Sequence, residues 1–195
     1  MKVLSKIKKP LIITLLAVLA ISYYIYLSHR DVNNDDKMAS DSKVATLISR
    51  DMDNNYPGTP RAVLSYFMDI QKIWYKEDIS KDEFNGLVQH ARDLFDDEML
   101  AVNDYESYCE RLEAEIESYK ESDRYISEYV IEDGYNIEYK TFNSQSYAIV
   151  DVKYFVIEGK NLHTVYEEYT LRKDNDSHWK ILFWKLTDGT RMEEQ

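Results

Sequence analysis

The spacing of apolar residues changes once along the chain, near Lys120, and this change restricts the folds that the chain can adopt. Between residues 60 and 119 apolar side chains recur at every third or fourth position, which is the period of an amphipathic helix. From Tyr125 to Leu186 they largely alternate, which is the period of a strand with one buried face. Helices followed by strands, rather than interleaved with them, predict an α+β domain.

Three helices are predicted before the change of period. Thr59 and Pro60 suit an N-cap and a first helical position, and the segment Ser80–Glu83 has the form of a capping box. A third helix is expected to begin near Asn103, with Glu106 at the box position. The residues that these helices are expected to bury are Val63, Tyr66, Phe67, Ile70, Ile73, Trp74, Phe84, Leu87, Val88, Ala91, Leu94, Phe95, Tyr108, Leu112, Ile116 and Tyr119.

Four or five strands are predicted after it, joined as an antiparallel meander. Their expected ranges are 125–131, 135–139, 147–157, 162–172 and 179–186. Asp133-Gly134 is a typical hairpin turn between the first two. The last strand is apolar at both alternating sets of positions, so we expect it at the centre of the sheet, covered on both faces. The expected fold is three helices packed on one curved antiparallel sheet.

An uncharged and largely apolar segment, residues 10–28, follows four lysines at the N-terminus. Its length is close to the ~20 residues that cross a bilayer as a helix, and the lysines before it predict a cytoplasmic N-terminus. The alternative is a signal peptide cleaved near Ala20-Ile21-Ser22. The apolar run continues to Leu27, which favours an uncleaved anchor, and either interpretation places the rest of the chain outside the cytoplasm.

The expected organisation has five parts. They are a cytoplasmic basic tail (1–9), a transmembrane anchor (10–28), a polar spacer (29–55) in which Ser42 can cap a short helix, an extracytoplasmic α+β domain (56–190) and a tail (191–195).

The distribution of charge excludes one class of partner. Residues 1–30 hold five basic residues and no acidic one, whereas the whole chain has 24 basic and 36 acidic residues. The part after residue 30 is therefore strongly acidic, and such a surface repels nucleic acid, whose binding needs Lys and Arg at the phosphates. The one cysteine, Cys109, excludes an intrachain disulfide and a cysteine zinc cluster.

Parts of the chain resemble known families. The order of elements and the ending Ser177-His-Trp-Lys-Ile-Leu-Phe-Trp-Lys-Leu186 resemble the cone-shaped nuclear transport factor 2-like (ketosteroid isomerase-like, cystatin-like) fold. The segments Asn55–Arg61, Leu171–Asp174 and Trp179–Ile181 look like an uncharacterised family of membrane-anchored clostridial proteins. The resemblance covers about residues 43–188 and implies a fold and a topology. Its motifs are caps and turns, so it carries no catalytic residue across.

Enzymes of this cone fold place an Asp, Tyr or His in an apolar pocket, where burial shifts its pKa. The candidates here are Asp151, His90 and His163. Each has a plainer interpretation. Asp151 shares a face with Lys153, which indicates solvent or an ion pair; His90 lies off the apolar stripe of its helix, which indicates the surface; His163 faces the same way as Glu167.

No cofactor or metal is expected. The acidic runs 31–36 and 96–98 lack the glycine and the ligand spacing of a calcium loop. Walker, Rossmann, Gly-x-Ser-x-Gly and His-Glu-x-x-His motifs do not occur. Cys109, next to Tyr108, is expected to be a small core or boundary residue.

Two functional classes remain. The favoured one is a non-catalytic binding or interaction module, held in the cytoplasmic membrane by residues 10–28, with a homodimer or a membrane or cell-wall protein as partner of the convex sheet face. It predicts an apolar or aromatic pocket without converging titratable groups. The alternative is an isomerase, dehydratase or hydrolase of the cone fold, which predicts that at least two of Asp151, His90, His163 and a tyrosine converge.

Overall fold

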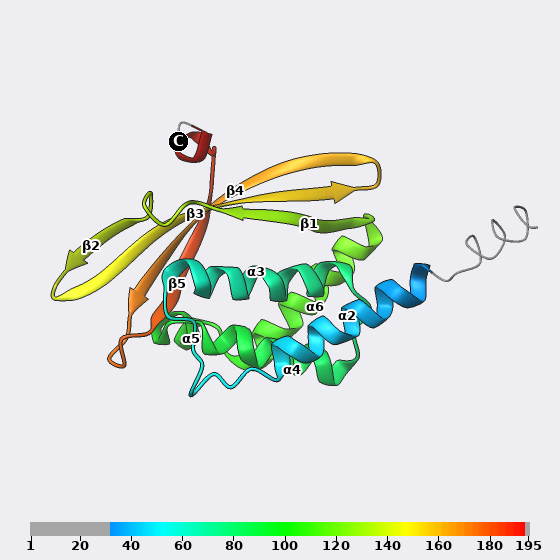
Figure 1. The fold of residues 1–195 in the computed structure, drawn as a ribbon, viewed down its shortest axis with the longest axis horizontal. Helices are drawn as coiled ribbons and strands as arrows, with labels where there is room; N and C mark the ends of the chain where they lie inside the picture. The colour runs from blue at the N-terminus through cyan, green and yellow to red at the C-terminus, as the bar shows by residue number, and fades with distance from the viewer. Residues whose placement is uncertain (1–31, 194–195) are drawn as a thin grey trace, which may run out of the picture. The chain divides into compact units, whose positions relative to one another are not determined.

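The computed structural model of the chain describes residues 32–193, with side chains described from Ser40 onward. The compact unit considered below begins at Ser42. Its helices lie on one face of an antiparallel sheet, except for a short C-terminal helix on the opposite side (Figure 1). The chain is therefore an α+β protein with an open sheet of five strands, as the change of period predicts.

Most helices precede the strands. The helices are α2 (Val32–Ile48), α3 (Pro60–Lys76), α4 (Lys81–Asp93), α5 (Asp97–Val102), α6 (Tyr105–Glu121) and α7 (Thr190–Glu193). The strands are β1 (Arg124–Ile131), β2 (Glu138–Phe142), β3 (Gln145–Glu158), β4 (Asn161–Lys173) and β5 (Trp179–Thr187). The order in the sheet is β1-β3-β4-β5, and β2 also pairs with β3.

Two of the three predicted helix caps are confirmed. Thr59 and Ser80 cap α3 and α4, and the capping box of α4 is complete. The third helix begins near Asn103 as predicted, but its cap is the next residue: Asp104 is the N-cap of α6, and its carboxylate accepts a 3.0 Å hydrogen bond from the backbone N–H of Ser107. Asn103 instead ends α5, a short helix that was not predicted.

The predicted hairpin at Asp133-Gly134 is wrong. β1 and β2 pair with β3 instead of with each other, with Ile131 opposite Val152 and Glu138 opposite Ile149. The two strands lie one after the other along β3, whose 14 residues are long enough for both. Alternation identifies a strand but not its neighbour, so this pairing could not be predicted from the local pattern.

β5 forms the edge of the sheet rather than its centre, contrary to the prediction. A β-bulge explains the misleading pattern, because β5 advances by two residues, from Ile181 to Phe183, while β4 advances by one. The bulge moves the inward-facing position from Ile181 to Trp184, so apolar residues from both alternating sets face the core. The start of this edge is covered by Phe95, which forms a parallel bridge with Ile181.

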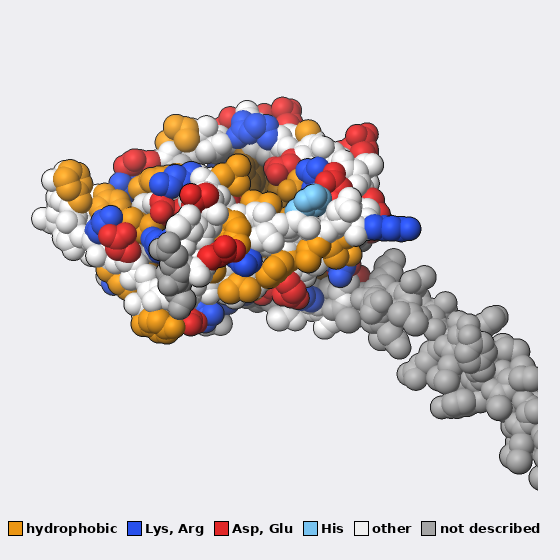
Figure 2. All heavy atoms as spheres, turned by 90° about the horizontal axis from the view of Figure 1, so that it is seen from above, with side chains coloured by type: hydrophobic (Ala, Val, Ile, Leu, Met, Phe, Trp, Pro, Cys, Tyr) orange, Lys and Arg blue, Asp and Glu red, His pale blue; other side chains and the backbone are white. Residues whose placement is uncertain are grey.

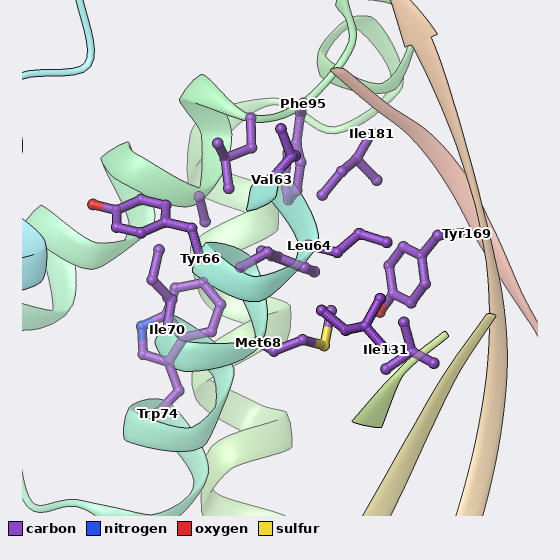
Figure 3. Close-up of a cluster of buried hydrophobic side chains, with 14 of the residues drawn as sticks. Val63, Leu64, Tyr66, Met68, Ile70, Trp74, Phe95, Ile131, Tyr169 and Ile181 are labelled. Atoms are coloured by element: carbon purple, nitrogen blue, oxygen red, sulfur yellow. The ribbon is translucent and has the colours of Figure 1, made fainter. Parts of the chain in front are cut away.

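The core lies between the sheet and the helices, and α3 runs through it. Figure 3 shows Leu64 and Met68 of α3 directed toward Tyr169 of the sheet, and Tyr66 and Trp74 directed away from it. The inward positions predicted for the long strand are all buried: Ala148, Val150, Val152, Tyr154 and Val156.

The end of α2 belongs to the folded unit, although residues 29–55 were predicted to be a spacer. Val44 is 1% exposed and Leu47 is 7% exposed. Ile48 packs on Gly86 of α4, where an added Cβ would lie 3.1 Å from the Ile48 side chain. The predicted apolar face is present, but Ser42 lies inside α2 and does not cap it, because the helix begins at Val32. The folded unit starts at Ser42 rather than at residue 56.

The predicted N-terminal anchor and C-terminal tail have different outcomes. Within residues 32–193 no helix is both long enough and apolar enough to span a membrane. The predicted tail 1–9 and anchor 10–28 lie outside the described residues. At the other end the predicted tail from residue 191 begins inside α7, which is docked on the sheet. Gly189, at φ +79°, turns the chain there, and an added Cβ would lie 2.6 Å from the Tyr166 ring.

Candidate functional site

Asp151 lies on the outer face of β3, away from the helices. The residue is only 5% exposed, and its Oδ2 lies 2.9 Å from Nε of Arg191 in α7. Burial raises the pKa of Asp151, and the Arg191 guanidinium opposes this shift. The predicted ion pair is present, but the cation is Arg191 and not Lys153, because the docked C-terminal segment covers this part of the sheet.

His90 is not the surface residue that was predicted. Its Nδ1 lies 2.9 Å from the hydroxyl of Tyr66, and its Nε2 lies 2.9 Å from the carbonyl oxygen of Ile48. A carbonyl can only accept, so Nε2 carries a proton. The Tyr66 hydroxyl also bonds to the carbonyl of Leu47 at 2.7 Å. The imidazole therefore joins α4 to α3 and to the end of α2, which is a structural role.

His163 lies near the start of β4, next to the turn that follows β3, and is exposed. Its Nε2 lies 3.5 Å from a carboxylate oxygen of Glu158, across the turn between β3 and β4. Asp151, His90 and His163 thus occupy the outer face, a helix interface and a hairpin end. The structure does not bring the three predicted candidates together.

A different set of polar groups converges on the inner face of the sheet. The hydroxyl oxygens of Tyr154 and Tyr169 are 2.7 Å apart, and Tyr169 donates a 2.7 Å hydrogen bond to Glu167. The Tyr154 hydroxyl also lies 3.3 Å from Oε1 of Gln71 and 2.7 Å from the sulfur of Met68, both on α3. We call Tyr154, Tyr169 and Glu167 the interior cluster.

Burial sets the electrostatics of the interior cluster. It raises the pKa of Glu167, while hydrogen bonds from Tyr169 and Tyr154 act in the opposite direction. It also raises the pKa of both tyrosines well above the usual value, so their hydroxyls stay protonated and can donate. Such a chain can hold or pass a proton. Tyr169 is 0% exposed and Tyr154 is 4% exposed, so protein side chains already cover both hydroxyls.

The sequence held one signal for this cluster that the prediction did not use. Glu167 occupies an inward-facing position of an alternating strand, two residues before the buried Tyr169. A carboxylate at such a position needs a hydrogen-bonding partner inside the protein. The partner Tyr154 comes from the neighbouring strand, and sequence spacing alone does not reveal that contact.

Several depressions open to the surface of the described residues, and two of them contain clusters of charged side chains. A groove of about 750 Å³ runs between residues 52–56, residues 92–97 and the β4–β5 turn. Some of its charges are paired within the protein: Arg172 binds Asp96 and also Glu98, the latter at 2.7 Å, and Lys180 lies 3.9 Å from Asp174. A cavity of about 330 Å³ lies on the outer face, where Asp151 and Arg191 contribute to its wall. We call it the outer cavity.

Metal binding has no support in this part of the chain. Within residues 32–193 no group of three or more His, Cys, Asp or Glu side chains is placed to hold an ion. Cys109 is free and half-buried beside the core, as predicted.

Comparison with protein families places the chain in a family of unknown function. A family model described as a domain of unknown function, DUF6715, matches residues 1–184. The chain belongs to the DUF6715 family. The search of curated proteins found no match. The DUF6715 match includes the interior cluster, Asp151 and the predicted anchor, and it ends before α7, so the segment that closes the outer cavity follows the matched region.

Proposed function

We propose that this chain is a membrane-anchored binding or protein-interaction module without catalytic activity. Residues 10–28 hold it in the cytoplasmic membrane, the N-terminus is cytoplasmic, and the α+β unit lies outside. The support is the placement of four lysines directly before an uncharged apolar segment of 19 residues, with all acidic residues after it. The partner, on this proposal, is a second copy or a membrane or cell-wall protein that contacts the outer, convex face of the sheet.

The fold proposed for the unit is the nuclear transport factor 2-like cone. Helices packed against one face of a single antiparallel sheet support it. The resemblance to membrane-anchored clostridial proteins remains part of the same proposal. A fold of this kind hosts both binding proteins and enzymes, so it does not choose between them.

The filled interior is the observation that carries the non-catalytic assignment. The space between sheet and helices is occupied by the side chains of the protein itself, with Phe67, Met68 and Tyr169 each at most 1% exposed. The predicted candidates are separated, and each is engaged with another part of the chain. We therefore assign the binding function to the surface of the unit.

The interior cluster favours a second candidate, an isomerase, dehydratase or hydrolase. Two tyrosine hydroxyls are hydrogen-bonded in series to a buried carboxylate, and such groups can transfer a proton. This differs from the apolar lining that the binding interpretation predicts. Turnover of a proton-transfer substrate that disappears on Glu167→Gln, in a protein of unchanged stability, would replace the binding module with an enzyme.

The topology is tested by protease treatment of intact protoplasts that carry the full chain. We expect cleavage to remove the α+β unit and to leave a fragment no longer than about residues 1–30, because only the anchor and the basic tail are shielded. Lysed protoplasts serve as the control for complete access. Full protection of the chain in intact protoplasts would overturn the proposal.

A further inference from the structure

Asp151, a residue in the wall of the outer cavity, has a side-chain oxygen that no group of the described chain satisfies. Asp151 is 5% exposed, and its Oδ2 is bound to Arg191, but its Oδ1 is buried and has no hydrogen-bond partner among the described residues. Asp151 forms part of the wall of the 330 Å³ cavity. A buried carboxylate oxygen without a donor is unfavourable, so this position is suited to a ligand that supplies one.

The charges around the cavity indicate the sign of the charge on that ligand. Arg191 is shared between Asp151 and Glu132, whose side chain is fully buried. The cavity wall itself contains the carboxylates of Asp151, Glu168 and Asp188 and the single guanidinium of Arg191. Glu168 is paired with Lys185 at 2.8 Å, and Asp188 adds another carboxylate to the wall. An excess of negative charge remains, and it favours a cation over a neutral hydroxyl compound.

The geometry narrows the kind of cation. Dedicated metal sites usually combine several carboxylate, imidazole or thiolate ligands, and the side chains described from Ser40 to Glu193 place no such group of three together. A guanidinium binds a carboxylate through both oxygens, but one oxygen of Asp151 is already held by Arg191. A primary ammonium has three donors in a compact head. Its donors match the acceptors that the lining residues carry, the carboxylate of Asp151 and the hydroxyls of Thr187 and Thr190.

We propose that the outer cavity, closed by the C-terminal segment and lined by Asp151, Glu168 and Arg191, is a binding site for a primary ammonium group. The group comes either from a free alkylamine or from a lysine side chain of a partner protein. This inference rests on the proposed binding function and names the ligand class of one site on its outer face.

The test measures binding of methylammonium to the full chain in detergent micelles, followed by NMR or calorimetry. We expect saturable binding that weakens at least tenfold on Asp151→Asn, which keeps the shape of the side chain and removes its charge. Glu168→Gln, at a partly exposed wall position, is the second variant and is expected to weaken binding severalfold. The matched control is Glu98→Gln, at an ion-paired carboxylate outside this cavity, which should bind as the wild type does.

Two further binding measurements test the need for an N–H donor and identify the source of the amine. Tetramethylammonium has the same charge without an N–H donor and should bind at least tenfold more weakly than methylammonium. A blocked peptide with one lysine is compared with putrescine. Tighter binding of the peptide identifies a protein partner, and equal or tighter binding of putrescine identifies a free amine.

Binding of the ammonium group should depend on pH. Asp151 faces Arg191 of α7, Glu132 after β1, Glu168 of β4 and Lys185 of β5. Protonation of Asp151 removes the charge that the ammonium contacts, so binding should weaken as the pH falls through the raised pKa of Asp151.

Absence of saturable binding, or equal binding by wild type and by both cavity variants, would overturn the inference. Neither result would affect the protease pattern of protoplasts, so this failure is distinct from a failure of the proposed topology.

Discussion

The two faces of the sheet bury polar groups in different ways. On the inner face two tyrosine hydroxyls and Glu167 form one hydrogen-bonded chain that helices cover. On the outer face Glu132 and Asp151 share the guanidinium of Arg191, which belongs to the short C-terminal segment. Figure 2 looks onto this second side, where acidic and basic side chains lie close together among hydrophobic ones.

The difference shows how alternation along a strand separates two environments. Neighbouring residues of β4, Glu167 and Glu168, point to opposite faces, and so do Tyr154 and Asp151 of β3. Aromatic packing surrounds the inner carboxylate, whereas charge balance keeps the outer ones in place. We therefore expect the inner face to respond most to loss of volume and the outer face to loss of charge.

The largest expected effect is the loss of an aromatic ring from the inner face. Phe67 is 1% exposed, and its ring centroid lies 5.6 Å from that of Phe95 and 5.8 Å from that of Trp184. Phe67→Ala should lower the free energy of unfolding by about 3–5 kcal/mol, because it removes buried area and leaves a cavity. Urea denaturation measures this. Phe183→Ala is the matched control, since Phe183 is 48% exposed, and it should change stability by less than ~0.5 kcal/mol. Similar losses for the two variants would contradict the assignment of the faces.

The next effect is the loss of the shared cation on the outer face. Arg191→Gln leaves the buried carboxylates of Glu132 and Asp151 without their guanidinium. We expect a loss of about 2 kcal/mol, below the full cost of breaking a buried pair, because the short C-terminal segment can move and admit water. Adding Asp151→Asn should restore part of the stability, since it removes the charge of one of the two carboxylates that Arg191 contacts. A single variant as stable as the wild type, by the same denaturation, would show that the segment is not held by this pair.

The features that the sequence predicts correctly depend on residues close together in the chain. Thr59 and Ser80 were identified as caps because a cap depends on residues within one turn. The buried face of β3 was identified because its period is local. The order of helices and strands, and hence the α+β class, follows from the same signals.

What was missed depends on residues far apart in the chain. The hairpin at Asp133-Gly134 was wrong because β1 and β2 both pair with β3, and the bulge in β5 concealed an edge strand. The partner of Asp151 is Arg191, from a segment interpreted as a tail. The interior cluster joins Tyr154 to Glu167 through Tyr169 across two strands. No period or spacing encodes such contacts, because packing decides them.

The smallest expected effect is a difference in pH dependence that isolates Glu167 on the inner face. Burial raises the pKa of Glu167 in the folded protein above its unfolded value. The folded state therefore binds more protons than the unfolded state between the two pKa values, and stability falls as the pH rises through the folded one. Glu167→Gln is neutral at every pH and lacks this loss. The variant should gain stability relative to the wild type as the pH rises through that range, measured by thermal unfolding from acid to neutral pH.

Glu158 provides a control of opposite sign for that measurement. Its side chain lies on the surface, where Arg124 holds the pKa of Glu158 below its usual value. Its contribution is present above the unfolded pKa and is lost as the pH falls through the folded one. Glu158→Gln should therefore lose stability relative to the wild type as the pH rises, by a small amount because solvent screens the pair. Slopes of the same sign for the two variants would mean that Glu167 is as hydrated as a surface carboxylate, and the inner face would then be open to water.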